Sequence, residues 1–335
     1  MEKTVSSAFI SAETIQKQLH ELWVCLGQQK SAVLRACAMT LIVVDRGQEE
    51  GTGEIYDILA ALMKNHPSRA IVLHLTPSTQ EAIQARVFAQ CRLPLGQSRQ
   101  ICCEQIEITS DVSRLPEAVT IVLGSMAPDL PVVLWCRSFD LLDVTGFRDL
   151  ANVVDKIITD SGRHSEPQIA FRRLLTLRRG QGVVADLAWT RLTPWREAVA
   201  QVFAMRACAT SSPHISQVRI WHGGPKASTA AYYLAAWLIN CLGWKPGESG
   251  ELAMLPIEIA APGEVMGLEA VSPEMTITVR QQSISELNIR VNGVQYHVRL
   301  PASPHAEALS EEMSILGADL VYDRSLERVV ELLRP

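Results

Sequence analysis

The chain of 335 residues lacks the features that mark several large classes of protein. No apolar run approaches the roughly 20 residues that a membrane-spanning helix needs. A net charge of −5 provides no excess of positive charge for binding nucleic-acid phosphates. The first residues have neither the apolar stretch of a signal peptide nor the arginines of a transit sequence. We therefore expect a cytoplasmic protein that binds neither membranes nor nucleic acid.

Catalytic and metal-binding motifs are also missing. None of the 8 cysteines forms a CxxC pair, and no histidine pair has zinc-ligand spacing. There is no GxSxG nucleophile motif and no phosphate-binding GxxxxGK[ST] loop. We expect no catalytic residues, metal or cofactor, and hence no enzymatic activity. The cysteines are expected to be reduced and mostly buried, except that one of the strand neighbours Cys102 and Cys103 should be exposed.

The remaining pattern predicts an α/β protein of two domains. Residues 1–165 alternate apolar runs with amphipathic helices, which is typical of a mostly parallel, Rossmann-like sheet covered on both faces. Residues 166–185 are predicted to be a helical connector, and 186–335 a smaller α+β domain. The predicted strands are Met39–Asp45, Ala70–Thr76, Gln105–Thr109, Pro131–Cys136 and Lys156–Asp160. The predicted helices are Ala12–Gln28, Glu54–Lys64, Thr79–Gln90 and a segment from Arg114 to Gly124.

The C-terminal domain has its own local signals. Val218–His222 is predicted to be a strand, and Ser228–Leu242 an apolar helix ended by Gly243. The Asn292-Gly293 pair favours a type I′ hairpin that pairs Val291 with Val294 and places the apolar residues on one face. Two final helices, near His305–Leu316 and Arg324–Leu333, are expected to cover that face.

The segment DLAWTRLTPWR, beginning at Asp186, is the most distinctive feature of the chain. It contains Trp189, Arg191, Trp195 and Arg196, and tryptophan and arginine are the side chains that most often anchor partner surfaces. Thr193 is expected to cap a helix that starts at Pro194. The alternative is that both tryptophans are core anchors and the arginines are solvated or paired.

The string DLAWTRLTPWREAVAQVF resembles the glucose-6-phosphate dehydrogenase assembly protein family, known as OpcA. Further segments match in the family's order: HPSRAIVL from His66, CEQIEI from Cys103, DLPVVLW from Asp129, and AAWL followed by LGW. The resemblance implies a non-catalytic protein that binds glucose-6-phosphate dehydrogenase, favours its active oligomer and promotes the oxidative pentose phosphate pathway. Trp189, Arg191, Trp195 and Arg196 would then form or brace the partner surface.

The chain departs from the family pattern in two respects. Cys136 follows Trp135 where a second tryptophan is common, and the chain is short compared with photosynthetic members. We therefore do not extend to this chain the thiol-dependent control of the dehydrogenase that is associated with photosynthetic members of the family.

Two loops lie at positions where α/β proteins often bind anions. The loop from Arg46 to Glu54 lacks the GxGxxG register and is too acidic for a dinucleotide, so we interpret it as a flexible acidic loop. Gly223, Gly224 and Lys226 follow a strand and precede a helix, where free N–H groups could bind a phosphate. A simple strand-to-helix turn capped by Ser228 would explain the same residues. If the site is real, the protein is alternatively a sensor of a sugar phosphate or another small-molecule effector.

His66, Ser68 and Arg69 precede a predicted strand and belong to the family pattern. Arg69 could pair with a carboxylate such as Glu104 on a neighbouring strand, which would make both residues scaffolding. Otherwise these side chains would line a surface cleft.

Overall fold

The computed structural model describes residues 2–5, 10–28, 33–46, 52–77, 82–93, 99–180, 182–205, 208, 214–245, 250–258, 260–300 and 305–333. Two compact units divide the chain. The first contains Met1–Thr159, Leu177–Val184 and His305–Gly317, and the second contains Asp160–Thr176, Ala185–Pro304 and Ala318–Pro335. The predicted acidic loop falls largely on residues 47–51, outside the described part of the chain.

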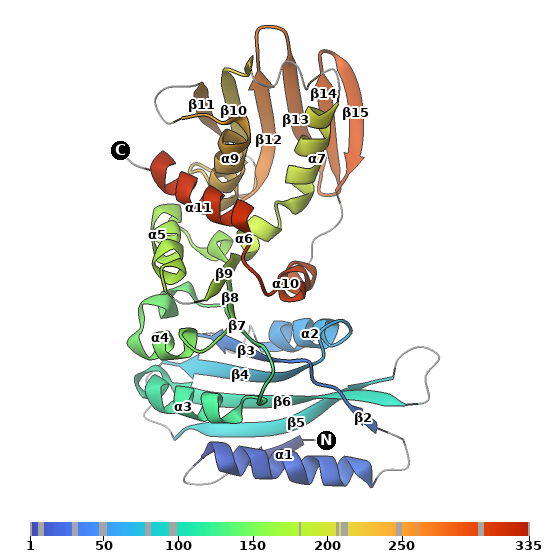
Figure 1. The fold of residues 1–335 in the computed structure, drawn as a ribbon, viewed down its shortest axis with the longest axis vertical. Helices are drawn as coiled ribbons and strands as arrows, with labels where there is room; N and C mark the ends of the chain where they lie inside the picture. Colours follow the sequence, from blue (N-terminus) through green and yellow to red (C-terminus); the bar gives the residue numbers. More distant parts are fainter. Residues whose placement is uncertain are drawn as a thin grey trace. The chain divides into compact units, whose positions relative to one another are not determined.

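A mixed, mainly parallel sheet forms the first unit (Figure 1). Its described strands run in the order β1-β5-β6-β4-β3-β7-β8-β9, with β2 pairing beside β6. Pairing is parallel from β6 through β4, β3 and β7 to β8, so the predicted Rossmann-like parallel layer is confirmed. The bounds are β1 Glu2–Val5, β2 Val33–Arg35, β3 Met39–Asp45, β4 Ser68–Thr76, β5 Gln84–Arg92, β6 Gln100–Asp111, β7 Val132–Cys136, β8 Lys156–Thr159 and β9 Val183–Asp186.

Two groups of helices pack in this unit. The helices α1 (Ala12–Gly27), α3 (Leu115–Ser125) and α4 (Thr145–Ala151) contact one another in series, whereas α2 (Thr52–Leu62) contacts α10 (His305–Ser314). Short 3₁₀ turns, η2 (Val112–Arg114) and η3 (Phe139–Asp143), connect strands to helices. Every residue of β3 and nearly every residue of β4 is buried, which is why their apolar residues follow one another, as in Leu41–Val44 and Ala70–Leu73, rather than alternating.

The predicted pairing of Arg69 with Glu104 is confirmed. Arg69 Nε lies 2.7 Å from Glu104 Oε2, and the two side chains are only 5% and 2% exposed. The guanidinium also donates to the Ser125 carbonyl at 2.9 Å, while Glu104 accepts from Trp23 Nε1 and pairs with Arg35 at 2.8 Å. The buried charges therefore tie β4, β6, α3 and α1 together.

The predicted helix Thr79–Gln90 is wrong. The described residues 84–92 form β5, which pairs antiparallel with β6. Ile83, Ala85 and Val87 are buried, and the residues between them are exposed. This period of two is the pattern of a strand with one covered face, and it outweighs the helix propensity of the alanines and glutamine.

The cysteine predictions also need correction. Cys91 of β5 lies directly opposite Cys102 of β6, and the two form a disulfide rather than staying reduced. Neither Cys102 nor Cys103 is exposed, because β6 is an interior strand of the sheet with both faces covered. Cys241 is an exception to the expected burial, because its side chain is exposed.

The helix α10 is held in the first unit by polar contacts. The buried Lys156 donates from Nζ to the carbonyls of Glu312 and Ile315 at 2.7 and 2.8 Å and pairs with the Glu312 carboxylate at 2.6 Å. A cation at a helix C-terminus satisfies carbonyls that have no partner within the helix. The expectation that this helix covers the C-terminal hairpin is therefore wrong.

The second unit contains a sheet whose described strands run β11-β10-β12-β13-β14-β15. All its neighbours are antiparallel except β10 and β11. The hairpin is confirmed in register, with Val291 opposite Val294 and Asn292 and Gly293 both at positive φ. The bounds are β10 Gln217–Gly223, β11 Glu251–Ile257, β12 Val265–Val271, β13 Thr276–Ser283, β14 Glu286–Val291 and β15 Val294–Arg299.

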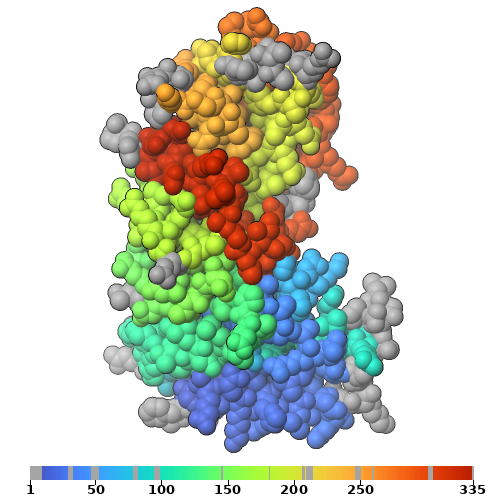
Figure 2. Space-filling model, viewed as in Figure 1, coloured from blue at the N-terminus to red at the C-terminus, as the bar shows by residue number. Residues whose placement is uncertain are grey.

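The apolar helix α9 (Thr229–Leu242) is the core element of this unit. Ser228 Oγ accepts from the Ala231 amide at its start, and Gly243 ends it in the left-handed conformation, as the sequence predicts. The last helix, α11 (Leu320–Leu332), packs against α9 and not on the hairpin (Figures 1 and 2). The unit also contains η4 (Ser161–Arg163), α6 (Leu187–Thr190) and α7 (Thr193–Ala204), and α5 (Pro167–Arg178) starts in it. Among the described residues, no helix is both long and apolar enough to cross a membrane.

The two ion pairs of Glu104 predict different costs of substitution. Arg69→Met leaves a buried carboxylate without its buried partner and should lower the free energy of unfolding by about 3 kcal/mol. Arg35→Met removes a half-exposed partner of the same carboxylate and should cost less than about 1 kcal/mol. Urea denaturation of both variants measures the difference, and equal losses would contradict a scaffolding role for Arg69.

Candidate functional site

The distinctive segment forms two short helical pieces. Asp186 caps α6 by accepting from the Ala188 amide at 3.0 Å. The second helix, α7, begins one residue earlier than predicted, with Leu192 in the cap position and no side-chain cap. Thr193 therefore does not cap it and instead accepts a hydrogen bond from Arg196 at 3.0 Å. Pro194 remains in the first turn, where its missing N–H costs nothing.

Trp189 is a core residue. Its side chain is buried, its ring packs against Tyr233 and Tyr322 with centroids 5.6 and 5.9 Å away, and its Nε1 donates to Asp319 Oδ2 at 2.9 Å. Asp319 also accepts from two amides at the start of α11. The indole thus joins α6, α9 and α11, as the core-anchor alternative predicts.

The two arginines of the segment are both engaged. The Arg196 guanidinium lies 3.5 Å from the centroid of the Trp189 ring, in a cation–π contact. Arg191 makes a bidentate pair with Asp160, at 2.6 and 3.1 Å. A bidentate arginine–carboxylate pair fixes the guanidinium in direction as well as in place.

Asp186 is a fully buried acid of the second unit. Its carboxylate accepts from the Ser161 amide at 2.9 Å, from Ala188 at 3.0 Å and from the Tyr233 hydroxyl at 2.8 Å. Burial, together with the nearby Asp160 carboxylate, raises its pKa from 3.8 to about 6 in spite of these donors. It connects η4, α6 and α9 at one point.

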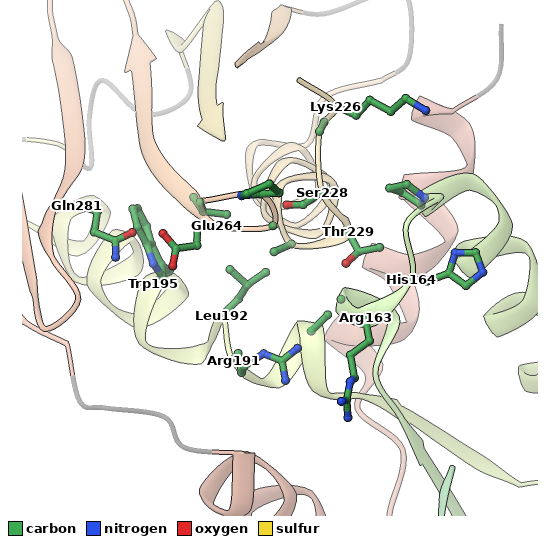
Figure 3. A pocket seen from close by; sticks show the side chains of 18 of the residues that line it. Arg163, His164, Arg191, Leu192, Trp195, Lys226, Ser228, Thr229, Glu264 and Gln281 are labelled. Carbon is green, nitrogen blue, oxygen red and sulfur yellow. The ribbon is translucent and has the colours of Figure 1, made fainter. Parts of the chain in front are cut away.

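A cavity of about 1010 Å³ opens beside this point, within the second unit (Figure 3). It is lined by η4, α6, the first turns of α7 and α9, and residues of and beside the six-stranded sheet. Among the predicted site residues, Arg191, Trp195 and Lys226 line it. Trp189, Arg196, Gly223 and Gly224 are not part of the lining, so the structure brings only some of the predicted residues together.

The glycine amides of the predicted anion site are already occupied. Gly223 N–H donates to the Glu264 carbonyl at 2.9 Å, and Gly224 N–H donates to the Ile257 carbonyl at 3.2 Å. A Cβ at Gly223 would overlap the carbonyl oxygen of Ala261, so close backbone approach explains this glycine. The two amides are therefore not available to a phosphate, and Lys226 pairs with Glu166 at 3.0 Å.

The structure adds lining residues that the sequence did not single out. They come from separate segments and include Arg163, Thr229, Glu264 and Gln281. No local motif joins them, and only the packing of η4, α9 and the sheet brings them to one cavity. Among the described residues, no group of three or more histidine, cysteine, aspartate or glutamate side chains is arranged to hold a metal ion.

The raised pKa of Asp186 gives a pH-dependent stability. An acid whose pKa is higher in the folded state stabilises the fold fully below its ordinary value of 3.8, and this contribution is lost as the pH rises through about 6. Asp186→Asn removes the titration, so wild type should gain stability over this variant as the pH falls from 7 to 4. Chemical denaturation at several pH values measures the difference; a constant or opposite trend would contradict the assignment.

Comparison with solved structures gives only distant likeness. A dehydrogenase of Clostridium difficile aligns with a TM-score of 0.46 at 9% identity, covering 88% of this chain and 97% of that one. An aldose-aldose oxidoreductase of Caulobacter crescentus aligns with a TM-score of 0.48 at 10% identity, covering 88% and 95%. Likeness at this level says nothing about shared activity.

Sequence comparison is more specific. A Synechocystis protein named OxPP cycle protein OpcA is 26% identical over 326 residues, covering 85% of this chain and 66% of that protein. A Synechococcus elongatus protein of the same name is 28% identical over 222 residues, covering 63% and 49%. The chain thus spans less than two thirds of the second relative and just under two thirds of the first. Residues 60–176 match the glucose-6-phosphate dehydrogenase subunit N-terminal domain, and residues 182–326 match the C-terminal domain. The chain therefore belongs to the glucose-6-phosphate dehydrogenase assembly protein family, OpcA.

Proposed function

We propose that this protein binds glucose-6-phosphate dehydrogenase and favours its active oligomer, without catalysing a reaction itself. The observation that carries the proposal is the match of both halves of the chain to the two domains of the glucose-6-phosphate dehydrogenase subunit family. Flux into the oxidative pentose phosphate pathway would rise as a consequence. The relatives carry the name of that pathway.

The physical requirement for such an activator is differential binding. A protein that bound the active and inactive forms of the dehydrogenase equally would shift nothing, however tight the complex. To favour one form, it must present a surface of fixed shape. The distinctive segment supports this requirement, since its side chains are held by stacking, ion pairing and burial rather than exposed on a loose loop.

Within that segment, we assign different parts to different residues. Trp189 and Arg196 support the proposed contact surface from the interior, because the indole is buried and the guanidinium covers its ring. Arg191 and Trp195 line the cavity, and we assign them to the contact with the dehydrogenase. Tryptophan and arginine at the centre of an interface contribute more binding energy than other residue types.

A non-catalytic role fits the groups that line the cavity. Of the cations in the lining, Arg191 is paired with Asp160 and the exposed Lys226 is paired with Glu166. Within the described residues of the cavity lining, no cysteine is present to act as a nucleophile.

The direct test titrates this protein into a steady-state assay of the dehydrogenase from the same organism. Size-exclusion chromatography with light scattering on the same mixtures reports the mass of any complex. We expect a saturable rise in activity together with a larger co-eluting species. An unchanged rate and unchanged masses, with both proteins folded, would refute the proposal.

The partner surface is tested by a matched pair of variants. Trp195→Phe keeps a buried aromatic ring on α7 but removes the second ring of the indole. It should raise the concentration of this protein that gives half-maximal activation of the dehydrogenase by about fivefold. Trp221→Phe, in β10 and outside the cavity lining, makes the same chemical change and should leave activation unaltered. Equal effects of the two substitutions would place the partner elsewhere, and thermal melts check that both variants remain folded.

A further inference from the structure

We propose that the cavity of the second unit binds a phosphorylated monosaccharide, with the phosphate at the start of α9 and the sugar beside Trp195. The binding step concerns the isolated protein and does not rest on the proposed partnership with the dehydrogenase. Four features of the cavity carry the inference.

The first feature is the start of α9, which lies in the cavity lining. Ser228 Oγ accepts a hydrogen bond from the Ala231 amide at 3.2 Å. The other N–H groups in the first turn of a helix have no acceptor within the helix. In the described part of the chain, the amides of Thr229 and Ala230 have no hydrogen-bond acceptor. Free amides and the positive end of the helix dipole together form a phosphate site.

The second feature is the hydroxyl of Thr229. The residue is 2% exposed and lines the cavity, yet its Oγ1 has no hydrogen-bond partner among the described residues. Figure 3 shows this oxygen on the side of α9 that faces Arg163 and Arg191. Buried hydroxyls without partners are uncommon in folded proteins, and a phosphate oxygen would supply the missing one.

The third feature is the charge of the lining beside α9. Arg163 belongs to η4, which contacts α9, and its side chain makes no ion pair with the described residues. Lys226 is 71% exposed and pairs with the half-exposed Glu166, a contact weak enough to exchange for a phosphate. Arg191 is not counted, because Asp160 already neutralises it.

The fourth feature is the opposite end of the cavity. Trp195 lies there beside Gln281 and Glu264 (Figure 3). An aromatic side chain with a neighbouring amide and carboxylate suits the apolar and hydroxyl groups of a sugar. The Glu264 carboxylate repels a phosphate, so the ligand is expected to bind in one orientation. A cavity of about 1010 Å³ accommodates a monosaccharide phosphate.

Isothermal titration calorimetry on the full chain tests the inference, with glucose 6-phosphate, ribose 5-phosphate, glucose and inorganic phosphate as probes. At least one sugar phosphate should bind more tightly than either glucose or phosphate alone. Thr229→Val, which removes the unpaired hydroxyl at nearly constant volume, should weaken that binding about tenfold. Arg163→Ala should weaken it by at least as much, whereas Arg172→Ala, an exposed arginine of α5 outside the cavity, should not change it.

Three results would overturn the inference: no heat with either sugar phosphate at millimolar concentration, equal affinity for inorganic phosphate and the sugar phosphates, or equal effects of Arg163→Ala and Arg172→Ala. Thermal melts confirm that each variant is folded. Because no dehydrogenase is present, failure here leaves the activation assay unaffected. Conversely, a protein that binds a sugar phosphate but does not activate the dehydrogenase would refute only the proposed function.

Discussion

The buried carboxylate of Asp186 is the constraint around which the second unit is built. A charged or partly charged oxygen pair in the interior must be surrounded by donors, and here the donors come from η4, α6 and α9. The hydrogen bonds from Ser161 and Ala188 hold the first residues of η4 and α6, and the bond from Tyr233 holds one face of α9 against the carboxylate. The adjoining pair of Asp160 and Arg191 extends the same network towards the cavity. The cavity lies beside the point where these elements meet, and η4, α6 and α9 each contribute residues to its lining.

The same constraint changes how the distinctive segment is interpreted. A sequence with two tryptophans and two arginines suggests an exposed recognition surface, but Trp189 is enclosed by Tyr233, Tyr322 and the Arg196 guanidinium. Large aromatic side chains gain most from burial, and a stacked arginine can cover a ring without losing its hydration entirely. The side chains of the segment are therefore held in fixed positions, and Trp195 and Arg191 line the cavity.

In the first unit, the successes and errors of sequence interpretation have identifiable causes. The parallel strands β3, β4 and β7 are buried on both faces and therefore appear in the sequence as continuous apolar runs. The pairing of Arg69 with Glu104 can be predicted from the sequence, because a charged residue at the start of a buried strand needs a partner of opposite charge. The strand β5 was missed because its apolar residues alternate over a short stretch rich in helix-forming residues. The position of α10 was missed because Lys156, which holds it, lies about 150 residues earlier in the chain.

The sequence by itself determined the elements whose signals are local: the capped helix α9 with its glycine end, the Asn-Gly hairpin, the parallel α/β layer and, through ordered matches, the family. Tertiary structure decided everything that required distant segments to meet. It occupied the amides of Gly223 and Gly224 with backbone carbonyls, buried Trp189, and brought Arg163, Thr229 and Gln281 to one cavity. The reason is physical: capping and turn formation are satisfied within a few residues, whereas burial and the pairing of interior polar groups depend on which elements pack together.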